Sequence, residues 1–274
     1  MVHVARSVLS RRRAECLHRS TLLADEFFRG LAGVLRGAQV VRISDRNAET
    51  HSARESRLLG LSFVPPDRLG ILGAGRQALE TSQYCRELGL HPAFFLEEGA
   101  PPYSRDERDY GAPILRFDDD LRRLLGTPVV SAVGHPSVRR RLLDRWPSSR
   151  FSTVISRQAW LAADAVVGEG STVAPLAALN RRVVVGKHVL VNVGSILSHD
   201  VVVGDLSTLS PRSAIGGGSV IDPEVFVGIG ATIIDQIKIG RGAIVGAGAV
   251  VVHDVEMHTT VVGVPARPVN RHER

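Results

Sequence analysis

The sequence predicts a parallel β-helix preceded by a small α/β domain, and two patterns carry this prediction. In the first, every sixth residue from Val167 to Val251 is Val, Leu or Ile, without an insertion. The residue four positions further on is always small or aliphatic, as in Ser171, Ala177 and Val183. A period of six fits neither an α-helix nor a flat strand, whose periods are 3.6 and 2. A short period sustained over this length indicates a β-helix, in which each hexapeptide is a short strand followed by a corner.

The second pattern precedes the repeat and reads as a strand, a glycine turn, a helix and a second strand. Residues 69–72 form the first strand, Gly73 and Gly75 lie in the turn, and residues 93–96 form the second strand, which ends at Glu97. This order is typical of the opening unit of a nucleotide-binding sheet. Amides at the helix N-terminus could hold a phosphate, and Glu97 could accept from a ribose or a base. A turn used only for close helix–strand packing is the alternative.

Three segments follow from these patterns. Residues 1–66 are an N-terminal extension, partly disordered or helical, with an amphipathic helix expected at 22–35 and a polar loop at 44–57. Residues 67–150 are a Rossmann-like domain with room for about four strands, which favours a mononucleotide or nucleotide sugar over NAD. Residues 151–274 are the β-helix domain with its C-terminal tail. The ladder is expected to run from about Ile155 to about Val255, and the tail to cover the last coil, whose edge is otherwise open.

Composition limits the class of protein. The formal net charge is +6, and nearly all of the basic residues are arginine, because the only lysines are Lys187 and Lys238. This balance suits phosphate-bearing small ligands, and no nucleic-acid-binding motif accompanies it. Cys16 and Cys85 form no disulfide framework, and no apolar run reaches transmembrane length. We therefore expect a cytoplasmic protein that binds neither membrane nor nucleic acid.

The residues of the repeat that are suited to chemistry begin with His199 and Asp200. His199 lies two residues after an inward aliphatic residue, so its side chain should project outward near a corner. Asp200 could orient the imidazole through Nδ1–H and leave Nε2 as an acceptor. A neutral imidazole is suited to general-base catalysis at neutral pH. The alternative is an exposed histidine on a solvated face.

Two further features of the repeat have both a chemical and a structural interpretation. Gly216, Gly217 and Gly218 leave backbone amides uncovered, and such amides can stabilise a developing oxyanion. Asn192 follows an inward valine, and its side-chain amide could bind a substrate carbonyl. A tight corner that needs glycine, and an internal polar ladder for Asn192, are the structural alternatives.

Together these features carry a resemblance to a known family. The hexapeptide ladder, Ser198-His199-Asp200, the glycine-rich corner and the terminal Gly263-Val264-Pro265-Ala266-Arg267 resemble the hexapeptide-repeat acyltransferases. The α/β unit in front makes the chain similar to bacterial sugar acetyltransferases of the sialic-acid O-acetyltransferase and UDP-4-amino-sugar N-acetyltransferase group. The resemblance covers residues 69–267. It implies a left-handed β-helix with three strands per coil, a homotrimer, acetyl-CoA as co-substrate, and active sites between subunits.

The resemblance also implies roles for individual residues. His199 matches the catalytic base, Asp200 its acidic partner, and Gly217 the amide that binds the acetyl carbonyl. Two residues match positions near the reacting groups, namely Asn192 in the acceptor pocket and Thr208 where some relatives carry a second histidine near the thioester. The wall along the cofactor matches Ile229, Ala247 and Pro265. The nucleotide-sugar site matches Gly73, Gly75 and Glu97, although relatives often have Gly-His-Gly and an Asp pair there.

The predicted function is therefore transfer of an acetyl group from acetyl-CoA to an amine or hydroxyl of a nucleotide-linked sugar, without a metal. Transfer to an amino acid or an antibiotic intermediate, or of a longer acyl group, is an alternative. A zinc enzyme on the same fold would need three converging histidines, and His188, His199 and His253 lack the required spacing. A non-catalytic trimeric scaffold is the remaining alternative.

Overall fold

The structure is a computed structural model that describes residues 67–99, 106–119 and 121–271. All of these residues belong to one compact unit, Val40–Arg274. The extension predicted at 1–66, with its helix at 22–35 and its loop at 44–57, lies outside the described residues. Within the described ranges, no helix combines the length and the apolar character that crossing a membrane requires.

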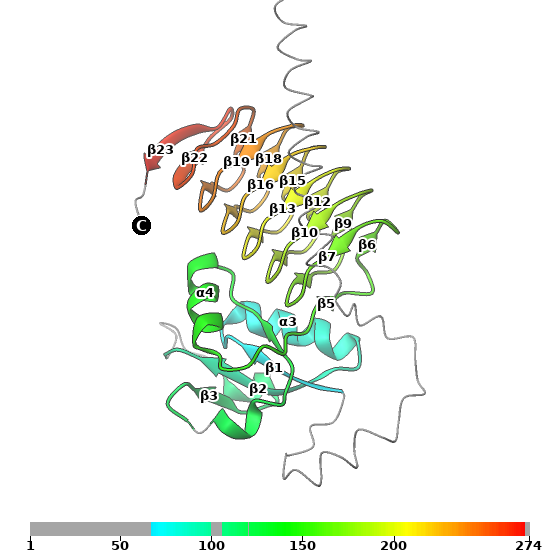
Figure 1. Ribbon diagram of the computed structural model, residues 1–274, viewed down its shortest axis with the longest axis vertical. Helices are drawn as coiled ribbons and strands as arrows, with labels where there is room; N and C mark the ends of the chain where they lie inside the picture. Colours follow the sequence, from blue (N-terminus) through cyan, green and yellow to red (C-terminus); the bar gives the residue numbers. More distant parts are fainter. Residues whose placement is uncertain (1–66, 100–105, 120, 272–274) are drawn as a thin grey trace, which may run out of the picture. The chain divides into compact units, whose positions relative to one another are not determined.

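The first described part is a parallel four-stranded sheet with two helices, and its strand order is β3-β2-β1-β4 (Figure 1). The strands are β1 Arg68–Leu72, β2 His91–Glu97, β3 Ile114–Arg116 and β4 Val129–Ser131. The helices are α3 Arg76–Glu87 and α4 Pro136–Arg145, with short 3-10 helices η2 Glu107–Tyr110 and η3 Leu121–Leu124. The strand, turn, helix, strand order and the Rossmann-like sheet predicted from the sequence are confirmed.

Helix α3 forms because its apolar and small residues recur every three or four positions and face the sheet. The buried ones are Ala78, Thr81, Ser82, Tyr84 and Cys85. The helix ends where Gly89 adopts a φ of 77°. Glycine reaches this left-handed conformation without the steric cost that a Cβ would bring.

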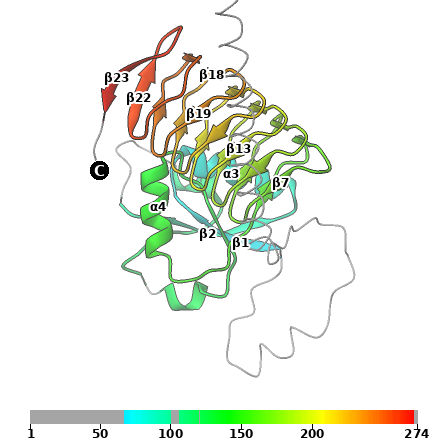
Figure 2. The ribbon, with the colours of Figure 1, turned by 45° about the horizontal axis from the view of Figure 1, so that its top comes forward.

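The second described part is a coil of two-residue strands that form three parallel faces (Figures 1 and 2). The first face contains β5 Val154–Ile155, β8 Thr172–Val173, β11 Leu190–Val191, β14 Thr208–Leu209, β17 Phe226–Val227, β20 Ile244–Val245 and β22 Thr259–Val262. The second contains β6 Trp160–Leu161, β9 Ala178–Leu179, β12 Ile196–Leu197, β15 Ala214–Ile215, β18 Thr232–Ile233 and β21 Val250–Val251. The third contains β7 Val166–Val167, β10 Val184–Val185, β13 Val202–Val203, β16 Val220–Ile221 and β19 Lys238–Ile239. The predicted left-handed parallel β-helix is confirmed.

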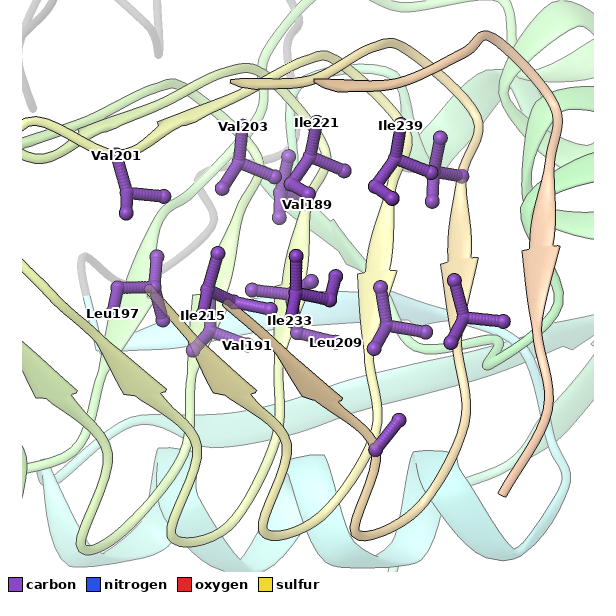
Figure 3. Close-up of a cluster of buried hydrophobic side chains, with 14 of the residues drawn as sticks. Val189, Val191, Leu197, Val201, Val203, Leu209, Ile215, Ile221, Ile233 and Ile239 are labelled. Atoms are coloured by element: carbon purple, nitrogen blue, oxygen red, sulfur yellow. The ribbon is translucent and has the colours of Figure 1, made fainter. Parts of the chain in front are cut away.

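The ladder of aliphatic residues forms the core of this coil. Each face pairs residues one full coil apart, such as Val184 with Val202. Because neighbouring residues of a strand point to opposite sides, the second residue of each strand points inward. Figure 3 shows Leu197, Ile215 and Ile233 pointing inward in a row, and each is at most 1% exposed. The small residues four positions further on are buried in the same core.

The C-terminal tail closes the coil in part as predicted. The amide of Val250 donates to the carbonyl of Gly263 at 3.0 Å, and the amide of Ala266 donates to the carbonyl of Val250 at 2.7 Å. The tail therefore covers the edge of β21. The ladder continues beyond the predicted end at Val255, because β22 adds a strand to the first face before β23 (Arg267–Arg271) turns back antiparallel to it.

A buried arginine joins the α/β part to the β-helix. Arg139 of α4 is 1% exposed. Its guanidinium donates to the carbonyls of Val133, Leu206 and Ser207 and to Oγ1 of Thr208, at 2.5–3.0 Å. Burial lowers the pKa of Arg139 to about 9, so the side chain stays charged at neutral pH. Both terminal nitrogens of this buried charge are hydrogen-bonded, whereas Nε has no partner. The contact is held firmly, because losing these acceptors would leave the charge uncompensated.

A second contact between the α/β part and the β-helix lies beside Arg139 and centres on Glu224. Glu224, which is buried, accepts from Arg140 of α4 at 2.7 Å and from Arg241 at 2.9 Å. Further along, Asn192 donates to Oε1 of Gln77 in α3 at 3.1 Å. The α/β part therefore packs on the first face and on the corners at both of its edges.

Replacing Ile239 with alanine tests the stacked core. Ile239 is fully buried at the end of the third face, so Ile239→Ala should lower the free energy of unfolding by about 2–5 kcal/mol. The neighbouring outward residue gives a matched control, and Lys238→Ala should change it by about 0.5 kcal/mol or less. Urea denaturation followed by circular dichroism measures both, and equal effects would contradict the assigned inward register.

Candidate active site

The candidate catalytic residues lie on one corner of the β-helix, between the second and third faces; we call it the second corner. Residues 18 apart occupy equivalent places on it, so Arg181, His199, Gly217 and Asp235 succeed one another along the coil. The backbone links them, since the amide of Asp200 donates to the carbonyl of Arg181 at 3.0 Å. The three-strand coil thus brings together side chains from separate hexapeptides.

His199 is held by its neighbour in the sequence, as predicted. Nδ1 of His199 lies 2.8 Å from Oδ2 of Asp200. Hydrogen bonds from Arg182 and His199 lower the pKa of Asp200 to about 2, with Arg182 the larger cause, so the carboxylate is ionised and can only accept. A neutral imidazole must then carry its proton on Nδ1. Its Nε2 is left as the acceptor that a general base needs.

Gly217 packs directly against the imidazole. A Cβ added to Gly217 would lie 2.7 Å from Cε1 and 2.8 Å from Nε2 of His199, so only glycine admits the ring in this position. The sequence assigned the Gly217 amide to an oxyanion, but in the structure this N–H donates to Oδ1 of Asp235 at 2.8 Å. The amide is already hydrogen-bonded within the corner, because Asp235 of the next coil supplies a carboxylate there. In this geometry, the absence of a side chain at Gly217 leaves space for the imidazole of His199.

Asn192 and Thr208 both lie against the α/β part. Asn192 is buried, donates to Gln77 and accepts from the amide of Val193 at 2.8 Å. Thr208 is 1% exposed, and its hydroxyl donates to the carbonyl of Gly134 at 2.6 Å. Both belong to the contact between the α/β part and the first face. Thr208 is thus enclosed by protein, which corrects its predicted contact with the cofactor.

Two of the residues predicted along the cofactor, Ile229 and Ala247, are exposed one coil apart on the corner between the first and second faces, which we call the first corner. Ile229 is 55% exposed. Pro265 is also exposed, but it lies in the tail, two residues beyond the place that the pairing of Val245 with Val261 makes equivalent to Ala247. The amide of Gly248 donates to the carbonyl of Ile229 at 2.8 Å, which links the coils of Ile229 and Ala247. The three residues of the predicted wall are therefore exposed, and their contact with an extended cofactor stays a prediction.

The glycine turn and its acid meet in one cleft of about 520 Å³. Its lining includes the predicted Gly73, Gly75 and Glu97 together with Glu98 and Arg141. Gly73 needs to be glycine, because its φ is 123° and a Cβ would lie 2.8 Å from Val133. The carboxyl ends of parallel strands form the usual ligand site of such a sheet.

The carboxylates of this cleft form ion pairs with neighbouring arginines. Glu98 forms ion pairs with Arg141 at 3.2 Å and with Arg145 at 3.3 Å, both from α4. The hydrogen bond from Arg141 is the largest cause that lowers the pKa of Glu98. Glu97 is buried, and its Oε1 lies 3.6 Å from Nε of Arg116. The cleft therefore offers carboxylate acceptors beside guanidinium donors.

Sequence reasoning missed Arg182, which binds Asp200 through two hydrogen bonds of 2.5 and 2.7 Å. The signal was present, because Arg182 and Asp200 are 18 residues apart, which is one coil. Arg141 gave no such signal, since its place in the cleft depends on how α4 packs. Among the residues that the structure describes, no three His, Cys, Asp or Glu side chains gather as a metal site would require.

The comparisons with known proteins match this arrangement. No family model matches the chain, and no curated protein matches it significantly. Among solved structures, it is similar to PerB from Caulobacter crescentus in complex with CoA and GDP-perosamine. The two are 29% identical, with 76% of this chain and 100% of that chain covered and a TM-score of 0.67. Another structure from the same organism is described as a perosamine N-acetyltransferase.

Two other solved structures agree. The acetyltransferase domain of PglB from Neisseria gonorrhoeae is 26% identical, with 74% of this chain and 100% of that chain covered and a TM-score of 0.65. WeeI from Acinetobacter baumannii is 28% identical, with the same coverage and a TM-score of 0.64. The predicted resemblance to sugar acetyltransferases is confirmed. The predicted enzyme class, an acyltransferase, is confirmed with it.

Replacing Gly217 with alanine tests the packing against the imidazole. The added Cβ should push the ring away from its hydrogen bond with Asp200, and kcat for acyl transfer should fall about tenfold or more. Gly126→Ala is the matched control, because a Cβ there meets no atom within 4 Å. Steady-state kinetics and a crystal structure of the variant measure the effect. An unmoved ring with unchanged kcat would contradict the assigned packing.

Proposed function

We propose that the protein transfers an acetyl group from acetyl-CoA to an amine of a nucleotide-linked sugar, with His199 as the general base. The observation that carries the proposal is the imidazole held through Nδ1 by an ionised Asp200, which leaves Nε2 exposed as an acceptor. The solved structures similar to this chain support the substrates, because they include a complex with CoA and GDP-perosamine. An aminated sugar is favoured over a hydroxyl acceptor, since a similar structure is described as an N-acetyltransferase.

The reaction needs one proton transfer and no covalent enzyme intermediate. The neutral amine of the acceptor attacks the thioester carbon, and a C–N bond forms while the C–S bond breaks. Nε2 of His199 takes the proton from the nitrogen and delivers it to the leaving thiolate. General-base catalysis of this kind contributes about 10²–10⁴ in rate. The described cysteine, Cys85, is buried in the α/β part and takes no role.

The acceptor and the co-substrate have separate places in this proposal. The nucleotide would occupy the cleft at Gly73 and Gly75, with Glu97 as an acceptor for its sugar or base, and Arg141 near its phosphates. The pantetheine chain would follow the first corner past Ile229 and Ala247 towards Pro265 in the tail. Each assignment uses the chemistry of the lining side chains. A cytoplasmic location for this reaction stays a prediction.

A second copy of the chain would complete the site. The α/β part packs on the first face, through Arg139, Glu224 and Asn192. In a three-faced coil the second corner lies opposite the first face, so His199 is on the far side of the β-helix from this contact. We therefore propose a homotrimer in which one copy presents the acceptor and its neighbour supplies His199.

The first experiment measures release of the CoA thiol from acetyl-CoA with purified protein. The acceptors are UDP-, TDP-, GDP- and CMP-linked amino sugars, and free sialic acid and serine are included. We expect turnover with a nucleotide-linked amino sugar and a fall in kcat of about 10²–10⁴ in His199→Ala. Circular dichroism of the variant controls for folding.

Each outcome of that assay tests a different part of the proposed function. Turnover only with a free acceptor would refute the nucleotide assignment and keep the base. Full activity in His199→Ala would refute the base. Acetyl-CoA binding without turnover on any acceptor would refute the proposed acceptor class, and failure to bind acetyl-CoA would favour the scaffold alternative.

Subunit complementation tests the shared site. Glu97→Ala should weaken acceptor binding and His199→Ala should remove the base, so each variant alone should be nearly inactive. Assemblies that contain both, co-expressed with two affinity tags and purified through both, should regain activity because some sites combine two intact halves. Mixed assemblies no more active than the separate variants, or an active monomer, would contradict a site shared between copies.

A further inference from the structure

Beside the proposed base and its partner, the second corner holds an arginine that the resemblance did not assign. Arg182 lies one coil before Asp200, and its guanidinium donates from Nε to Oδ1 at 2.5 Å and from Nη2 to Oδ2 at 2.7 Å. Oδ2 is also the oxygen that accepts from Nδ1 of His199 at 2.8 Å. Three side chains from two coils thus form a continuous chain of hydrogen bonds that ends at the imidazole.

We propose that Arg182 is a positioning residue that fixes the carboxylate of Asp200, and through it the tautomer and orientation of His199. The inference rests on the proposed function of His199. A bidentate arginine–carboxylate pair sets both the plane and the rotation of the carboxylate. With Asp200 so held, Oδ2 faces Nδ1, and Nε2 is directed away from the pair.

Exposure explains why such a support is needed. The side chains of Arg182, Asp200 and His199 are 54%, 38% and 68% exposed. Packing therefore restricts their rotation little, apart from the contact of the ring with Gly217. Because exposed ion pairs contribute little to stability, the consequence of this pair is orientation. The hydrogen bonds from Arg182 are also the largest cause that lowers the pKa of Asp200.

The backbone at position 182 adopts a conformation that suits glycine. Arg182 has a φ of 57°, in the left-handed region, where L-residues are strained. The equivalent place two coils later is taken by Gly218, which adopts a φ of 67° without that strain. Asp200, at the same place one coil later, also has a positive φ of 63°, so this place accepts either glycine or a longer side chain.

This backbone makes Arg182→Gly a clean test, because the substitution removes the side chain while suiting the conformation of the corner. Thermal stability should be unchanged or slightly higher. With acetyl-CoA and the acceptor found above, kcat should fall about tenfold while both KM values stay within about twofold, since only orientation in the reacting complex is lost. Arg182→Lys should recover part of kcat, because an ammonium can hold one carboxylate oxygen but not both.

Two further variants separate this role from a general effect of charge. Arg181→Gln removes the neighbouring cation, which pairs with Asp164 instead, and should leave kcat within about twofold. Asp200→Asn breaks the link, so adding Arg182→Gly to it should cause no further loss. Losses that multiply in the double variant, or a kcat equal to wild type in Arg182→Gly, would overturn the inference.

A spectroscopic measurement keeps the inference testable if no acceptor is turned over. In protein labelled with ¹⁵N-histidine, the neutral ring of His199 should carry its proton on Nδ1 in the wild type. Arg182→Gly should show a mixture of both tautomers, and Arg181→Gln should match the wild type. The same tautomer in Arg182→Gly as in the wild type would overturn the positioning role. Lack of turnover in the wild type would instead refute the proposed function.

Discussion

Stacking of inward aliphatic side chains, one coil apart, is the interaction on which the rest of this structure depends. Leu197, Ile215 and Ile233 exclude water from a narrow interior only if the coil repeats without change. That constraint fixes the spacing of every corner residue. Side chains 18 positions apart are therefore neighbours, and the second corner gains Arg182 beside Asp200 and Gly217 beside His199. The regular core thus brings chemically different side chains together at the second corner.

Two arginines show how burial changes what the same side chain does. Arg139 is enclosed, and its terminal nitrogens donate to backbone carbonyls, so its hydrogen bonds hold two parts of the chain together. Arg182 is about half exposed and pairs with a single carboxylate. Water screens that pair, and its energy contributes little to folding. Its geometry nevertheless limits the rotation of Asp200, which is what an exposed imidazole requires to present one nitrogen.

The α/β part and the imidazole serve one reaction in our proposal, although a single chain keeps them apart. Contacts through Arg139 and Glu224 place the α/β part on the first face, whereas His199 belongs to the opposite corner. The same packing encloses Thr208 and engages Asn192. Residues that the resemblance assigned to substrates are thus used to join the domains, and the cleft that holds Gly73 is left for the acceptor.

The sequence by itself determined the period, the β-helix, the succession of strand, turn, helix and strand in the first unit, and the pair His199–Asp200, because each depends on spacing along the chain. It also contained the separation along the chain, one coil, that places Arg182 beside Asp200. Only the tertiary structure decided that Asp235 takes the Gly217 amide and that α4 covers Thr208. Those outcomes depend on which groups meet across coils and across the domain contact. Hydrogen-bond partners and burial are set by packing in three dimensions, which a one-dimensional period does not contain.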